Sequence, residues 1–165
     1  MSRRSRSLRI AGTSAMLALL LVAGREACAQ IVGTLTNTAG LDFGRFVAAT
    51  GGTVVVSATG LRSRTGGVIL LNSPSVAAAA FAVGTSGNRG TKLKSFILTL
   101  PANGTVRLTS GSNSMAVGSF VSSPAAGTTV SISTTTASVG ASLTVAPNQA
   151  AGTYSGSFSV IANFQ

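Results

Sequence analysis

Side chains that can carry acid–base, nucleophilic or metal-binding chemistry are scarce in this chain of 165 residues. It has no histidine, one cysteine (Cys28) and two acidic residues (Glu26 and Asp42). A Ser-His-Asp triad, a Cys-His pair and the usual zinc sites all need residues that are missing. Asp42 is expected to form hydrogen bonds in a turn or at the start of a strand, as aspartates often do.

One catalytic arrangement remains, a serine beside Lys92 or Lys94. Both lysines lie in the stretch 87–94, whose charge and glycines are typical of an exposed loop. We therefore predict that the protein is not an enzyme and that it uses no cofactor and no metal.

The first 29 residues have the layout of a secretory signal peptide. Four arginines precede residue 10, an apolar run follows over residues 11–24, and Ala27-Cys28-Ala29 is a small-residue cleavage site. The run is short for a membrane-spanning helix, which needs about 20 residues; an uncleaved anchor is the alternative. Cleavage after Ala29 would leave a mature chain, 30–165, with no cysteine and Asp42 as its only acid, so a catalytic carboxylate pair is excluded as well.

The mature chain is rich in Val, Thr, Ser and Gly and lacks the spacing of an amphipathic helix, which predicts an all-β domain. Short strands between frequent turns favour an immunoglobulin-like antiparallel β-sandwich. Asn103-Gly104, between two apolar segments, predicts a β-hairpin, and residues 77–80, four alanines, are taken as strand although a helical turn is the alternative. The expected strands are 31–37, 41–47, 53–58, 68–72, 77–83, 94–100, 105–109, 115–121, 130–134, 142–146 and 154–164.

The last residues alternate between apolar and polar, with Phe158, Val160, Ala162 and Phe164 on one face. A terminal strand of this kind needs a partner strand, which another chain could supply. The segment resembles the C-terminal strand of chaperone-usher pilus subunits, which have a glycine fourteen places from the end, here Gly152, and an aromatic residue at the penultimate place, here Phe164.

The mature N-terminus, residues 30–40, is the candidate donor strand, followed by a sandwich domain over residues 41–165. Ile31, Gly33 and Leu35 share one face of this extended segment. The pilin resemblance implies that Ile31 and Leu35 would enter a groove of a neighbouring subunit, and that the C-terminal residues of that subunit line the groove. Gly33 would let the donor backbone pass a bulky side chain at the edge of the groove. The alternative is that this segment is the first strand of its own sandwich.

A second resemblance covers nearly the whole mature chain and is to the bacterial secreted family called domain of unknown function 4402. Its residues are 41–44 (Leu-Asp-Phe-Gly), 51–56 (Gly-Gly-Thr-Val-Val-Val), 98–101 (Leu-Thr-Leu-Pro) and 152–156 (Gly-Thr-Tyr-Ser-Gly). The family has no established activity, and the likeness implies a structural role in a fimbria or surface coat. The missing disulfide departs from the commoner pilins.

We therefore expect a structural subunit of a bacterial surface fibre, pilus or coat, exported through the periplasm to the cell surface. Its expected partners are further copies of itself and a periplasmic chaperone, and it would meet a membrane only during export. The alternatives are a monomeric secreted adhesion or matrix module and, as a minor possibility, a small outer-membrane β-barrel, against which the short strands and few aromatic residues argue.

Two basic clusters remain, Arg62 with Arg64 and Arg89 with Lys92 and Lys94, in a mature chain whose net charge is +6, from seven basic residues and one acid. They are candidate contacts for an anionic surface polymer, although solvated loops that keep the protein soluble are the favoured reading. Without aromatic residues interleaved among them, they predict no specific nucleic-acid site.

Overall fold

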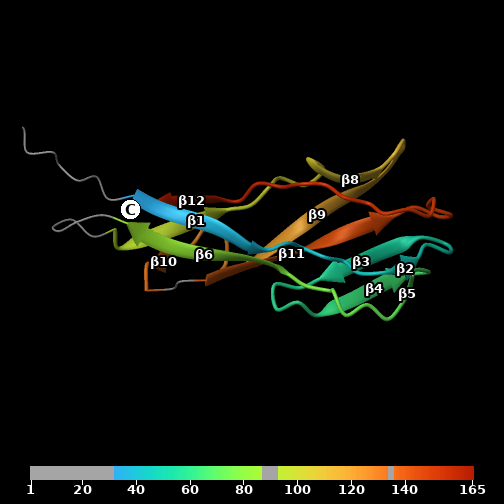
Figure 1. The fold of residues 1–165 in the computed structure, drawn as a ribbon, viewed down its shortest axis with the longest axis horizontal. Coiled ribbons are helices and arrows are strands. Elements are labelled where there is room, and N and C mark those ends of the chain that lie inside the picture. Colours follow the sequence, from blue (N-terminus) through green and yellow to red (C-terminus); the bar gives the residue numbers. More distant parts are fainter. Residues whose placement is uncertain (1–31, 87–92, 134–135) are drawn as a thin grey trace, which may run out of the picture.

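A computed structural model describes residues 32–86, 93–133 and 136–165, and within these ranges the chain forms strands and turns but no helix (Figure 1). Every paired strand runs antiparallel to its neighbour. The prediction of an all-β antiparallel fold is confirmed. The strands are β1 (Val32–Ala39), β2 (Phe46–Val47), β3 (Gly52–Val56), β4 (Arg62–Gly66), β5 (Ile69–Leu70), β6 (Ala79–Ser86), β7 (Ser95–Thr99), β8 (Val106–Ser110), β9 (Asn113–Ser123), β10 (Thr129–Ser131), β11 (Thr136–Val145) and β12 (Ile161–Phe164).

The larger of two layers is a seven-stranded sheet organised around β11. One edge of β11 pairs first with β6 and then with β3, and its other edge pairs with β9. The outer strands are β1 beside β6, β4 beside β3 and β8 beside β9. Gly140 lies where the partner changes, and a Cβ atom there would overlap the backbone of Val56 and Ser57. Only glycine therefore allows β3 to approach β11 this closely.

The second layer consists of the sheet β10–β7–β12 and the short pair β2–β5. The molecule is elongated, with β1, β6 and β12 towards the end that carries the C-terminus and β2, β4 and β5 towards the other (Figure 1). The C-terminal residue, Gln165, is held in the small sheet because it exchanges backbone hydrogen bonds with Ser95 of β7.

The core between the layers has two clusters that β11 joins. Its residues Ala137, Val139, Ala141, Leu143 and Val145 alternate inward and are almost completely buried. Around the second half of β11 the first cluster adds Phe43, Val54, Val56, Val68, Val106, Met115 and Val117. Around the first half the second cluster adds Ala79, Phe81, Val83, Phe96, Leu98 and Val130. Leu41, Phe120 and Phe158 pack against both, so the core is continuous.

The hairpin predicted at Asn103-Gly104 is wrong. The strands on either side of this turn belong to different layers, since β7 pairs with β10 and β12 whereas β8 pairs with β9. The Asn103 side chain is used elsewhere: its Oδ1 accepts a hydrogen bond from the Ser119 backbone N–H at 2.6 Å. The turn therefore connects the two sheets and is anchored to β9.

Two predicted strands are much shorter in the structure, and one observed strand was not predicted. The segment 41–47 is paired as a strand only at β2, because it is interrupted at Gly44, whose φ of 70° lies in the left-handed region. The prediction 154–164 is reduced to β12, with a separate bridge between Ser155 and Thr109. The polar strand β4 was not predicted, because it lacks alternating apolar residues. The alanines from Ala79 belong to β6, so the helical alternative is wrong for that part.

Candidate functional site

One predicted donor residue and one predicted acceptor residue, Gly33 and Phe164, meet where β1 lies against β12. Gly33 lies directly under the ring of Phe164, and a Cβ atom at Gly33 would overlap that ring. The Phe164 ring also packs against Phe96, with ring centroids 6.0 Å apart. Two residues selected from opposite ends of the sequence thus form one contact. Ile31 lies outside the described residues.

The strand β1 is an edge strand that is attached to the body along one side. Seven of its residues pair with β6, and the face that carries Gly33 and Leu35 contacts β12. Leu35 packs against the second cluster, but none of the eight residues of β1 is buried. In the structure this segment pairs with β6 of its own chain and lies beside Phe164, and its exchange between chains stays a prediction.

The predicted acceptor residues divide between two places. Phe158, Val160, Ala162 and Phe164 all pack against the second cluster, and the last two belong to β12, which contacts β1. Gly152 instead lies in a groove at the β2 side of the molecule. Grouping all five on one surface was therefore inaccurate for Gly152, because residues 156–160 cross from the edge of β8 to the edge of β7.

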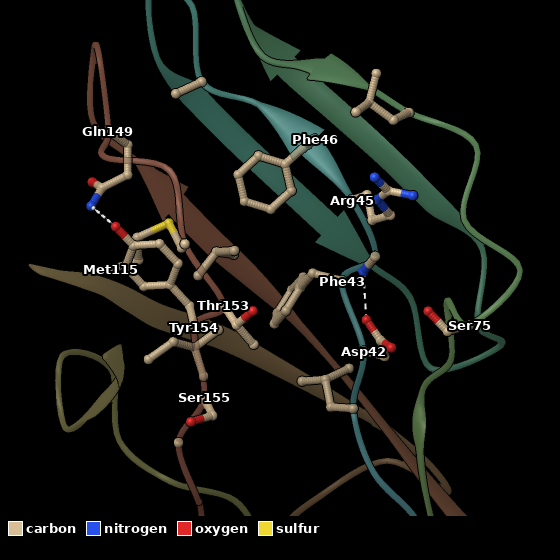
Figure 2. A pocket seen from close by; sticks show the side chains of 18 of the residues that line it. Asp42, Phe43, Arg45, Phe46, Ser75, Met115, Gln149, Thr153, Tyr154 and Ser155 are labelled. Carbon is tan, nitrogen blue, oxygen red and sulfur yellow. Dashed lines mark hydrogen bonds between the residues drawn. The ribbon is translucent and has the colours of Figure 1, made fainter. Parts of the chain in front are cut away.

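This groove has a volume of about 990 Å³ and runs between residues 39–48 and residues 149–156. Figure 2 shows Phe43, Phe46 and Met115 between its two rims. Asp42, Arg45 and Ser75 lie on one rim, and Gln149, Thr153, Tyr154 and Ser155 lie on the other. The groove was not predicted, although two of its segments, 41–44 and 152–156, are among the residues that carry the family resemblance.

Each rim is held in place by hydrogen bonds. Gln149 Nε2 donates to the Tyr154 hydroxyl at 2.9 Å, and that hydroxyl donates to the Ala150 carbonyl at 2.8 Å. On the other rim the backbone of Asp42 exchanges two hydrogen bonds with Ala77. The Asp42 carboxylate accepts the Gly44 N–H at 2.6 Å, which confirms its predicted role in a turn.

The basic residues that were predicted to form two clusters have different surroundings in the structure. Arg62 donates to the backbone carbonyls of Phe43, Arg45 and Leu71, at 3.2, 3.2 and 2.7 Å, so it joins β4 to the groove wall. Arg64 is exposed on β4 and donates to the Gly66 carbonyl.

Lys94 is exposed, and its backbone N–H donates to the Gln165 carbonyl. Arg89 and Lys92 lie outside the described residues, as do the predicted signal peptide and its cleavage site. Among the described residues, no helix is long and apolar enough to span a membrane.

The comparisons with known proteins bear on the family alone. No curated protein and no solved structure matches this chain. A family model described as "Domain of unknown function (DUF4402)" matches residues 34–164, which include every described strand from the middle of β1 to the end of β12. The chain therefore belongs to the DUF4402 family.

Proposed function

We propose that this protein is a structural subunit of a bacterial surface fibre or coat, and that copies assemble by exchanging the N-terminal strand β1. The observation that carries the proposal is the contact of Gly33 with Phe164. A glycine at this one place lets the backbone of β1 pass beneath an aromatic ring that closes the sandwich edge. The same contact would form with β1 from the same chain or from a neighbour.

Three features of β1 make exchange physically accessible. It is at a sheet edge, and none of its residues is buried, so its release exposes less apolar surface than that of an inner strand. It is joined to the body through Gly40, where a Cβ atom would meet nothing within 4 Å, so the hinge has room to change direction. Strand addition to an open edge gains main-chain hydrogen bonds along the whole segment.

Assembly through a donated strand also accounts for the absence of disulfides. Residues 30–165 contain no cysteine, so an exported chain gains its cohesion from its core and from pairing between subunits. Before assembly, a strand of a periplasmic chaperone would lie along β6 in the place of β1. The exposed Arg64 and Lys94 are available to an anionic surface polymer.

A monomeric secreted adhesion or matrix module is the second candidate. It is favoured by the pairing of β1 with β6 of its own chain. The two candidates differ in whether β1 stays with that chain at the cell surface.

Engineered cysteines distinguish them. Thr36 and Ala82 are directly opposite each other on β1 and β6, and the mature chain has no competing thiol. Opposed residues in a ladder are close enough for a disulfide after small adjustments. We expect the oxidised double variant, recovered from the bacterial surface and boiled in detergent without reductant, to form a ladder of covalent multiples.

The matched control places cysteines at Arg107 and Ala116, which are opposite each other in the β8–β9 hairpin. This pair stays within one chain in either case and must give a monomer band. A monomer band for the Thr36–Ala82 pair as well, with its thiols consumed, would refute strand exchange.

A further inference from the structure

We propose that the groove between residues 39–48 and 149–156 binds a neutral oligosaccharide. It lies on the β2 side of the molecule, away from the contact of Gly33 with Phe164 (Figure 1). The residues that line it are distinct from those of strand exchange, apart from Ala39 at the end of β1 and Gly40 at the hinge. The inference does not rest on the proposed function.

The charge of the lining favours a neutral ligand. Among the described residues that line it, Asp42 and Arg45 are the only charged ones, and they lie on the same rim. A polyanion such as a nucleic acid needs a run of basic side chains, and here a single arginine is accompanied by a carboxylate. A divalent cation needs several oxygen ligands of this kind, whereas the lining offers one carboxylate.

The middle and the rims of the groove suit the two kinds of surface that a sugar ring presents. Phe46 and Tyr154 are half-buried, so part of each ring remains accessible to the apolar C–H face of a pyranose. The rims supply acceptors and donors for hydroxyl groups, which themselves both donate and accept. Asp42 and the Gln149 amide oxygen are acceptors, and the Arg45 guanidinium is a donor.

The rim side chains are oriented before any ligand arrives. The bonds from Gln149 to Tyr154 and from Tyr154 to Ala150 fix one rim, and the bond from Gly44 to Asp42 fixes the other. Side chains that are already ordered lose less conformational entropy on binding. The volume of about 990 Å³ is at the upper end of the range of about 300–1,000 Å³ for ligand pockets, which suits several sugar units rather than one.

An extended peptide is the other ligand that this geometry could accept. The Leu71 N–H donates to the Arg45 carbonyl, so Phe46 and Leu70 form a non-hydrogen-bonded pair, and the backbone N–H and C=O of Phe46 face away from β5. We favour a saccharide because the two hydrogen-bonded rims consist of side chains that match hydroxyl groups. The peptide is an outcome of the test.

The test uses the mature protein, residues 30–165, on an array of neutral oligosaccharides of three to six units of glucose, galactose, mannose and N-acetylhexosamine. The best ligand is then titrated by NMR. We expect amide signals of the groove rims to shift, and binding to weaken by about tenfold or more in Asp42→Asn, which keeps an oxygen for the Gly44 N–H, and in Gln149→Ala. The control Arg64→Gln, outside the groove, should bind as the parent does.

Three results would overturn the proposal. One is that no neutral oligosaccharide on the array binds. Another is that Gln149→Ala and Asp42→Asn, each shown to be folded by its thermal transition, bind the sugar as the parent does; if one variant fails to fold, the other decides. The third is that a synthetic peptide of residues 30–39 shifts the rim signals while no sugar does, which would make the groove a strand acceptor.

Discussion

Replacing Gly33 by alanine should destabilise the protein because the new methyl group would overlap the Phe164 ring. Overpacking of this kind costs about 1–3 kcal/mol. Replacing glycine in a strand also raises the free energy of unfolding by about 0.5–1 kcal/mol, because alanine has less conformational freedom than glycine in the unfolded chain. The free energy of unfolding of Gly33→Ala should therefore fall by about 0.5–2 kcal/mol.

A double-mutant cycle attributes this change to the ring. Phe164→Ala alone removes a half-buried aromatic side chain and its contact with Phe96, a loss of about 2 kcal/mol. It also empties the space above Gly33, so adding Gly33→Ala in this background should be neutral or slightly stabilising. The coupling free energy between the two positions should be about 1–3 kcal/mol, the overpacking cost itself, because the gain from losing glycine is common to both backgrounds.

The assay is equilibrium unfolding of residues 30–165 in urea, followed by circular dichroism at a concentration where one species is present. The midpoint should shift without a change of slope. Gly40→Ala is the matched control in the same N-terminal segment, because a Cβ atom there meets nothing within 4 Å, and it should lie within about 0.5 kcal/mol of the parent. Additive effects at Gly33 and Phe164, or equal effects at Gly33 and Gly40, would refute the contact.

Two further predictions concern the body of the sandwich. Arg62→Met should lower the free energy of unfolding by about 2–3 kcal/mol, because three backbone carbonyls lose their donor. The control Arg64→Met loses one exposed hydrogen bond and should change the free energy of unfolding by about 0.5 kcal/mol or less. Thermal unfolding of both variants measures the difference, and equal effects would contradict the structural role of Arg62. Gly140→Ala should lower the free energy of unfolding by more than about 3 kcal/mol and yield little soluble protein, because backbone atoms of β3 cannot move aside as a flexible side chain can. A soluble variant with the parent's melting temperature would show that β3 and β11 are not in this register.

The groove shows where sequence reasoning stops. Asp42 and Tyr154 are 112 positions apart, and each had an ordinary local interpretation, as a turn residue and as part of a terminal strand. Their opposition across a cavity follows from the packing of residues 39–48 and 149–156 over the same face of the large sheet. Periodicity carries no information about such distances.

Arg62 shows the same limit for charge. This basic residue in a polar stretch was assigned to a solvated loop, with contact to an anionic polymer as the alternative, because no apolar alternation marked β4. Its three carbonyl partners come from two other segments that meet only when β2 pairs with β5. Whether a cation faces solvent or the backbone depends on tertiary contacts.

The sequence by itself determined that the described part of the chain is all-β, that several of its strands have one apolar face, and that the whole chain contains no histidine and only two acidic residues. These conclusions depend on composition and on the two-residue period of a strand, which are local properties. The tertiary structure decided which strands pair: it separated β7 from β8 despite their Asn-Gly turn, and it placed Gly33 under Phe164. Pairing depends on the burial of apolar faces between segments distant in sequence, and many pairings satisfy the same local pattern until the whole core is packed.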